Sequence, residues 1–211
     1  MTWRQKISLG FVAAFAVLML TSQVSAATTY TLSGSTYSFA SSLYAGATGI
    51  TGSFTTASPL PPNLNDAPIA GGTGGLGFVK SWSFNDGVFT YTDATSVPWT
   101  DGNNNAGSFA VSTDSKGNIT SFFIVLTMPK TGAVVGQLTE WLFLGFGGQG
   151  TSEALTAICH DLVAPGGACK DYLTTPDDAG SDDPGAATFS LACKLNKKGK
   201  CKNNKHHIFG G

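Results

Sequence analysis

Short alternations of apolar and polar residues, separated by turn residues, are the feature that most constrains the fold of this chain. In the stretch "SWSFNDGVFTYTD", Trp82 and Phe84 alternate with serines before the turn sequence Asn85-Asp86-Gly87. Such a turn suits a hairpin because glycine adopts a positive φ without strain. A second hairpin is predicted in "FAVSTDSKGNITSFFIVLTM", where a polar turn separates two runs. Side chains that alternate with a period of two lie on opposite faces of a strand, so both stretches predict β-hairpins.

The same pattern recurs along the chain and predicts an all-β protein. Strands are predicted at residues 28–33, 49–56, 79–84, 88–92, 108–113, 119–128, 140–145 and 188–192. The run "SFFIVLTM" is apolar on both faces, which is typical of a strand in the middle of a sheet. We therefore expect an antiparallel β-sandwich, with a jelly roll as one variant.

Other segments are expected to interrupt the strands. The stretches 57–77 and 94–107 are rich in Gly, Pro or Asn and predict long loops. One short helix is predicted from Ser152 to Leu162, because Leu155, Ile158 and Leu162 recur at helical spacing and Ser152 can cap the first turn.

The N-terminal segment has the pattern of a secretory signal peptide. Arg4 and Lys6 precede the apolar run "ISLGFVAAFAVLML", which is too short for a typical membrane span. Small residues lead up to Ala26, so cleavage is expected between Ala26 and Ala27. The sequence thus predicts a signal peptide at residues 1–26 and a β-sandwich domain at 27–193. No transmembrane segment is expected in the mature chain.

Charge is distributed unevenly along the mature chain. Residues 27–193 contain all 13 acidic residues of the chain but only a few lysines. Residues 194–211 form a basic tail that we expect to be flexible. An acidic body argues against nucleic acid as a partner.

The cysteines lie in the last third of the chain, at Cys159, Cys169, Cys193 and Cys201. An even number in an exported chain predicts disulfides. We expect Cys159–Cys169 and Cys193–Cys201, because each pair closes a short loop. The spacings differ from those of zinc ligands.

Several stretches, in order, are similar to one family of exported proteins. The segments "YTLSGSTYSF", "GITGSFTTASPLPPNL", "SFNDGVFTYTDATS", "FAVSTDSKGNITSFFIVLTM" and "DDAGSDDPGAATF" resemble the body of small exosortase-sorted (PEP-CTERM) proteins. The similarity covers most of residues 28–190. It implies a secreted, periplasmic or extracellular protein of a Gram-negative bacterium, often one that makes exopolysaccharide. The end "CKLNKKGKCKNNKHHIFGG" lacks the Pro-Glu-Pro motif and apolar helix of that family, so a freely secreted form is expected.

Little in the sequence indicates catalysis. His160 is the histidine of the body, and no G-x-S-x-G nucleophile elbow is present. Glycoside hydrolysis commonly uses two facing carboxylates, and the sequence places no second acid opposite Glu140. No catalytic residue is assigned, and a non-enzymatic protein is expected.

Calcium is the cofactor that the sequence suggests. Asp101, Asn103 and Asn105 alternate as oxygen ligands do in calcium loops. A second acidic cluster consists of Asp177, Asp178, Asp182 and Asp183. Solvated polar loops are the alternative interpretation of both stretches.

Trp99 is the candidate ligand-binding residue. It lies beside Asp101 and several asparagines, a composition typical of sugar-binding surfaces. The alternative, which is the commoner role of such a residue, is a Trp that pins its loop to the core. The leading hypothesis is a non-enzymatic envelope or secreted β-sandwich that associates with exopolysaccharide, extracellular matrix or cell-surface components. A secreted carbohydrate-active hydrolase and a structural or adhesive subunit are the alternatives.

Overall fold

The structure is a computed structural model that describes residues 27–71, 74–100, 108–146, 151–173, 175, 177–181 and 187–192. Within these ranges the regular secondary structure is almost entirely β-strand, and residues Ser42–Tyr44 form a 3-10 helix, η1. Neighbouring strands pair antiparallel, which confirms the predicted fold class. In this part of the chain no helix is long and apolar enough to cross a bilayer.

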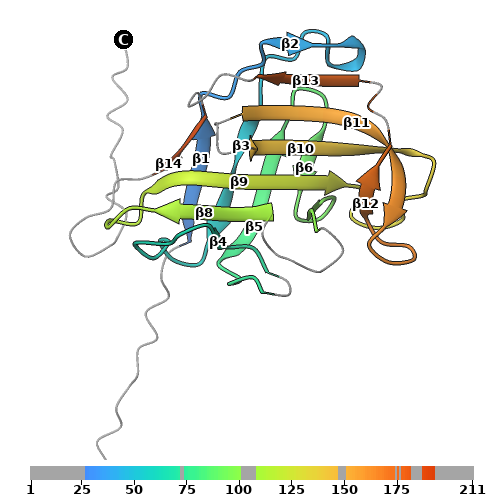
Figure 1. The fold of residues 1–211 in the computed structure, drawn as a ribbon. Coiled ribbons are helices and arrows are strands. Elements are labelled where there is room, and N and C mark those ends of the chain that lie inside the picture. The colour runs from blue at the N-terminus through green and yellow to red at the C-terminus, as the bar shows by residue number, and fades with distance from the viewer. Residues whose placement is uncertain are drawn as a thin grey trace, which may run out of the picture.

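The strands form two sheets that lie one behind the other (Figure 1). The smaller sheet has the order β14 (Thr188–Leu191), β1 (Thr28–Ser33), β3 (Thr51–Thr56), β5 (Val79–Asn85) and β6 (Thr90–Thr92). The larger sheet has the order β2 (Phe39–Ala40), β13 (Asp177–Ser181), β11 (Thr151–Leu162), β10 (Leu138–Phe146), β9 (Ile119–Met128), β8 (Phe109–Thr113) and β4 (Ala67–Pro68). In addition β12 (Cys169–Tyr172) pairs with β11, and β7 (Val97–Pro98) pairs with β9.

Consecutive strands are mostly neighbours, so each sheet is largely a meander. The strands β1, β3, β5 and β6 follow one another in the smaller sheet, and β8 to β11 do so in the larger one. Other pairings join strands that are far apart in the chain: β14 pairs with β1, β2 with β13 and β4 with β8. This order differs from the two Greek keys of a jelly roll.

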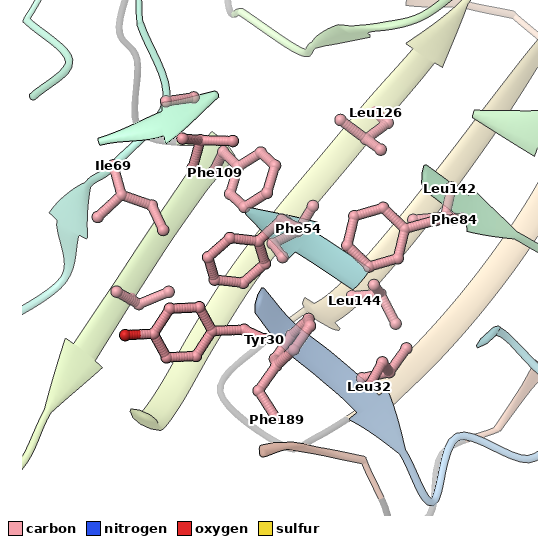
Figure 2. Close-up of a cluster of buried hydrophobic side chains, with 14 of the residues drawn as sticks. Tyr30, Leu32, Phe54, Ile69, Phe84, Phe109, Leu126, Leu142, Leu144 and Phe189 are labelled. Carbon is pink, nitrogen blue, oxygen red and sulfur yellow. The ribbon is translucent and has the colours of Figure 1, made fainter. Parts of the chain in front are cut away.

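The two sheets share one apolar core. Phe54 of the smaller sheet makes an edge-to-face contact with Phe109 of the larger sheet, with ring centroids 5.4 Å apart. Phe122 and Phe189 meet in the same way across the sheets at 4.9 Å. Figure 2 shows Phe54, Phe109 and Phe189 converging with the leucines of β9 and β10. Edge-to-face aromatic pairs add to the stabilisation from area burial, so this core fixes how the sheets face each other.

Two strands, β1 and β9, have the bounds that the sequence predicted. Strand β9 lies between β8 and β10, as its apolar run indicated. Ile124 and Leu126 face the shared core, whereas Val125 is buried on the opposite face. A strand buried on both faces reads as a continuous apolar run.

The predicted helix from Ser152 to Leu162 is wrong, because these residues lie in strand β11. The strand pairs with β10 along one edge and with β13 and β12 along the other. Both Ala154 and Leu155 are buried, so both faces of β11 are covered and the alternation is hidden. Backbone pairing on both edges therefore outweighs the helical spacing of its leucines and isoleucine.

Both predicted hairpin turns are present. In the turn between β8 and β9, Asp114 Oδ1 accepts hydrogen bonds from the backbone N–H groups of Lys116 and Asn118, at 2.7 and 2.9 Å. Gly117 has φ +80°, and a Cβ at this position would lie 2.6 Å from the carbonyl oxygen of Leu60. Glycine is required here for both its conformation and its size.

Candidate functional site

Many of the sequence candidates lie outside the described residues. These are Ala26, Asp101, Asn103, Asn105, Asp182, Asp183, Cys193 and Cys201. The signal peptide, the basic tail, the calcium loop and the second disulfide therefore stay predictions.

Asp177 and Asp178 belong to the acidic cluster and lie in β13. The side chains of both accept hydrogen bonds from the segment around η1 of the same chain. Asp177 Oδ1 accepts a hydrogen bond from the backbone N–H of Leu43 at 3.2 Å. Asp178 Oδ1 accepts one from the hydroxyl of Ser41 at 3.0 Å. Among the described residues no group of three or more His, Cys, Asp or Glu side chains is arranged to hold a metal ion. These two acids thus tie β13 to the η1 turn, and the calcium hypothesis stays a prediction.

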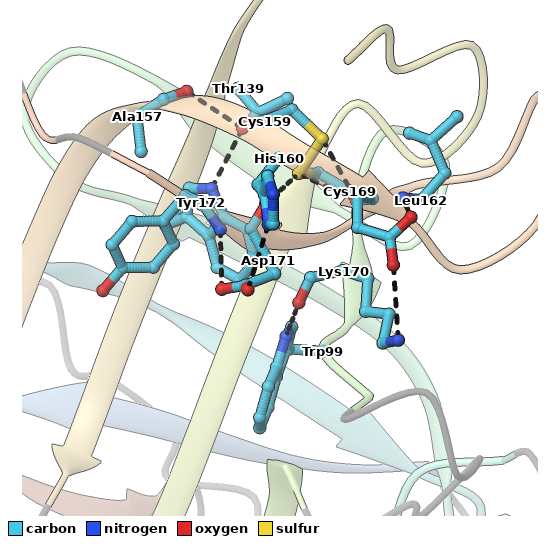
Figure 3. Close-up of a disulfide and its surroundings, with 12 residues drawn as sticks. Trp99, Thr139, Ala157, Cys159, His160, Leu162, Cys169, Lys170, Asp171 and Tyr172 are labelled. Carbon is cyan, nitrogen blue, oxygen red and sulfur yellow. Dashed lines mark hydrogen bonds and ion pairs between the residues drawn. A yellow bond between two sulfur atoms is a disulfide. The ribbon is translucent and has the colours of Figure 1, made fainter. Parts of the chain in front are cut away.

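Trp99 is half-buried and anchored at both its backbone and its ring. Its backbone N–H donates to Val125 at 2.9 Å, and its indole N–H donates to the carbonyl oxygen of Lys170 at 2.7 Å (Figure 3). The ring packs on the buried cluster that includes Trp141 and Leu155. These contacts favour the structural interpretation of Trp99, because its one polar group already holds β12 in place.

The predicted disulfide between Cys159 and Cys169 is present, with an S–S distance of 2.03 Å. It joins β11 to β12, and both cysteines are buried. His160 follows on β11, with its Nδ1 3.5 Å from Asp171 Oδ2, and both side chains are exposed (Figure 3). The sequence placed His160 beside a disulfide correctly, but on a helix that does not form.

Asp86, in the turn between β5 and β6, is fully buried, which the sequence analysis did not predict. Its Oδ1 accepts hydrogen bonds from the backbone N–H groups of Val88 at 2.8 Å and Phe89 at 2.6 Å. Its Oδ2 accepts hydrogen bonds from the hydroxyls of Tyr91 at 3.0 Å and Tyr44 at 3.4 Å. Both oxygens of this buried carboxyl group are therefore occupied by hydrogen-bond donors.

A third tyrosine completes this arrangement. The Tyr37 hydroxyl donates to the backbone carbonyl oxygen of Asp86 at 3.1 Å. We call Asp86 and these three tyrosines (Tyr37, Tyr44 and Tyr91) the Asp86–tyrosine cluster. Burial is the main cause that raises the pKa of Asp86, while its hydrogen bonds act in the opposite direction. Because Tyr37 and Tyr44 precede β3 and are remote in sequence from Asp86, the cluster holds the β5–β6 turn against the η1 segment.

Glu140 on β10 is half-buried and lies close enough to the cluster to interact with it electrostatically. Its Oε2 accepts a hydrogen bond from the hydroxyl of Thr156 at 2.7 Å. Burial raises the pKa of Glu140, and the negative charges of Asp86 and Asp177 raise it further. The structure thus places Asp86 and Asp177 within electrostatic reach of Glu140, and Asp86 is shielded from solvent.

Replacing Glu140 by glutamine is expected to change how stability depends on pH. The folded chain holds the pKa of Glu140 above its ordinary value of 4.5, so ionising this group costs more in the folded than in the unfolded state. The protonated Glu140 side chain therefore makes its full contribution to the free energy of unfolding below pH 4.5. This contribution is lost as the pH rises through the raised pKa of the folded state. Urea unfolding over a pH series should show the wild type losing stability relative to E140Q as the pH rises.

Thr156→Val provides the matched variant for this measurement. The Thr156 hydroxyl lowers the pKa of Glu140, so its removal should enlarge the difference from E140Q at neutral pH. Parallel pH profiles for the wild type and E140Q would contradict the placement of Glu140 in a desolvated, acidic environment.

Comparison with known proteins finds no matching family model, curated protein or solved structure.

Proposed function

We propose that this protein works outside the cytoplasm as a non-enzymatic β-sandwich that associates with polysaccharide of the cell envelope or extracellular matrix. The observation that carries the proposal is the buried disulfide between Cys159 and Cys169, because such bonds persist in oxidising compartments. The expected signal peptide and the resemblance to exported proteins of polysaccharide-producing Gram-negative bacteria point the same way.

The contacts of the buried acids support a non-enzymatic role. Asp86 has no exposed surface, so its carboxylate cannot reach a polymer substrate in this structure. Its oxygens hold a turn and two tyrosines, and Glu140 Oε2 is bonded to Thr156. Asp86 thus holds the β5–β6 turn to the η1 segment, and Glu140 is held by a residue of the neighbouring strand β11.

Export and oxidation are tested by fractionating cells that produce the full chain. The protein is expected in the periplasm or the medium, without residues 1–26, and with Cys159 and Cys169 joined in one peptide pair by mass spectrometry. Recovery from the cytoplasm with reduced Cys159 and an intact leader would contradict the proposal.

A carbohydrate-active hydrolase is the second candidate, and one observation favours it. Glu140 is half-buried with a raised pKa, which is the property of a general acid in glycoside hydrolysis. Asp177 lies within electrostatic reach and is also partly exposed, so it is the candidate second carboxylate. Release of reducing sugar that is lost in both E140Q and D177N would favour this candidate.

A further inference from the structure

The outward face of the smaller sheet is covered by hydroxyl side chains. Buried residues such as Tyr30, Phe54 and Phe84 point into the core, so their neighbours along each strand point outward. The outward residues are Thr29, Thr31, Ser33, Thr51, Ser53, Thr55, Ser81, Ser83, Asn85, Thr90, Thr92, Thr188 and Ser190. We call this set the hydroxyl face. Every member is Ser, Thr or Asn, so none of these side chains is charged, and the exposed Lys80 at the bulge in β5 is the one charged side chain beside them.

Strand register places these side chains in rows. One row crosses all five strands of the smaller sheet and consists of Ser190, Thr31, Ser53, Ser83 and Thr92. Neighbouring strands in a sheet lie about 4.8 Å apart, and residues on one face of a strand repeat about every 6.7 Å. The hydroxyl face is therefore a regular two-dimensional array of hydrogen-bonding groups.

Part of the hydrogen-bonding capacity of this face is already used between strands. Thr55 and Ser81 share a hydrogen bond at 2.6 Å, and Asn85 Nδ2 donates to the Thr90 hydroxyl at 2.9 Å. A hydroxyl group has one donor and two acceptor positions, so such pairs keep further positions for a ligand. The cross-strand bonds also fix the orientation of these side chains before a ligand arrives, which lowers the entropy lost on binding.

The scarcity of charge on this face requires an explanation. Threonine is favoured in strands, but strand preference alone gives no reason to omit lysine or glutamate from a solvated face. Lysine in particular is a common residue for protecting sheet edges from aggregation. The one charged residue in these five strands is Lys80, which lies beside the irregular pairing of β5 and whose Nζ donates to the Gly77 carbonyl oxygen at 3.0 Å. A neutral partner is favoured by a surface that offers hydrogen bonds without charge.

We propose that the hydroxyl face is the surface that contacts polysaccharide, and that the polysaccharide is a neutral one. This inference rests on the function proposed above and adds to it the surface and the ligand class. Sugar hydroxyls are donors and acceptors, as are the serine and threonine hydroxyls that face them. Each hydrogen bond exchanged with water contributes little net free energy, so affinity comes from many contacts along one polymer.

Co-sedimentation of the mature chain with insoluble cellulose, a neutral polysaccharide, tests the inference. The double variant T31K/S83K introduces two charged, bulky side chains into the central row. The matched control S115K/S121K adds the same charge at exposed serines in the β8–β9 turn and on β9. We expect T31K/S83K to weaken binding by about ten-fold, as the loss of one or two net hydrogen bonds would. The control should bind within about two-fold of the wild type, since its substitutions lie off the face.

The outcomes separate this inference from the proposed function. If the wild type binds cellulose and T31K/S83K binds equally well, the hydroxyl face is excluded while polysaccharide association stands. If the wild type binds neither cellulose nor the anionic polysaccharide alginate, the proposed function itself fails. Binding to alginate alone would contradict the neutral ligand class. Self-association that T31K/S83K abolishes, without cellulose binding, would assign the face to a second copy and overturn the inference.

A milder variant covers the case in which the added lysines disrupt the fold. T31V/S83A removes the same two hydroxyls with little change in shape and retains residues that strands accept. It is expected to bind cellulose about three-fold more weakly with an unchanged circular dichroism spectrum, as the loss of weak single hydrogen bonds predicts. Undiminished binding by T31V/S83A would overturn the inference.

Discussion

Replacing Asp86 by alanine is expected to lower the free energy of unfolding by about 3–5 kcal/mol. The substitution leaves two backbone N–H groups, at Val88 and Phe89, and two hydroxyls, at Tyr44 and Tyr91, without their acceptor. Buried donors without a partner are costly because they lose water without gaining a hydrogen bond. Urea unfolding monitored by tyrosine and tryptophan fluorescence measures the loss.

Asp86→Asn is the matched control for this prediction. Asparagine keeps one acceptor oxygen for the backbone N–H groups but presents an amide donor to the tyrosine hydroxyls. We expect it to cost about 1–2 kcal/mol, which is less than alanine. If alanine and asparagine both change stability by less than about 0.5 kcal/mol, as ordinary surface substitutions do, the cluster does not hold the turn.

Removing the disulfide with C159A/C169A is expected to lower the free energy of unfolding by about 3 kcal/mol. The two cysteines are 10 residues apart, and closing a loop of this size restricts the unfolded chain by roughly that amount. The loss should appear first as local opening of β12, because β12 pairs only with β11 among the described strands. Chemical denaturation gives the global value, and amide hydrogen exchange reports the local opening.

The other cysteines require a control in this experiment. In a background with Cys193 and Cys201 replaced by alanine, a reductant should destabilise the chain that retains Cys159 and Cys169. The same reductant should leave C159A/C169A unchanged in that background. Equal stability of the reduced and oxidised forms would mean that backbone pairing and Trp99 alone hold β12 against the larger sheet.

Sequence predicted the fold wherever one face of a strand is buried and the other is exposed. Strand β1 shows this pattern, since buried Tyr30 and Leu32 alternate with the half-exposed or exposed Thr29, Thr31 and Ser33. The two-residue strands β2, β4 and β7 were not predicted, because a strand of that length has no period to detect. β11 was mistaken for a helix because Leu155, Ile158 and Leu162 recur at helical spacing, and burial of both faces leaves no alternation to oppose that pattern.

The Asp86–tyrosine cluster could not be assembled from the sequence. The turn at Asn85-Asp86-Gly87 was visible, and so was the alternation of Phe89 and Tyr91 after it. Nothing in a local window indicates that Tyr37 and Tyr44 return to the same turn, since that depends on how the two sheets are joined. The disulfide was predictable because its loop is short and closes around a Pro-Gly-Gly turn.

The hydroxyl face lay within predicted strands but emerged only with the strand order. Each strand shows a few serines and threonines, which are ordinary for an exposed face. Register alone places Thr31 beside Ser53 and Ser53 beside Ser83. The scarcity of charged side chains on the whole face is seen only when the order of the five strands is known.

The most direct test of the proposed function is the migration of the mature chain through native gels that contain a neutral polysaccharide. We expect migration to slow progressively as the polysaccharide concentration rises, while the size of the polysaccharide stays constant after prolonged incubation with the protein. Migration that is the same with and without every polysaccharide, or a polysaccharide that becomes shorter during incubation, would contradict a non-enzymatic polysaccharide-binding protein.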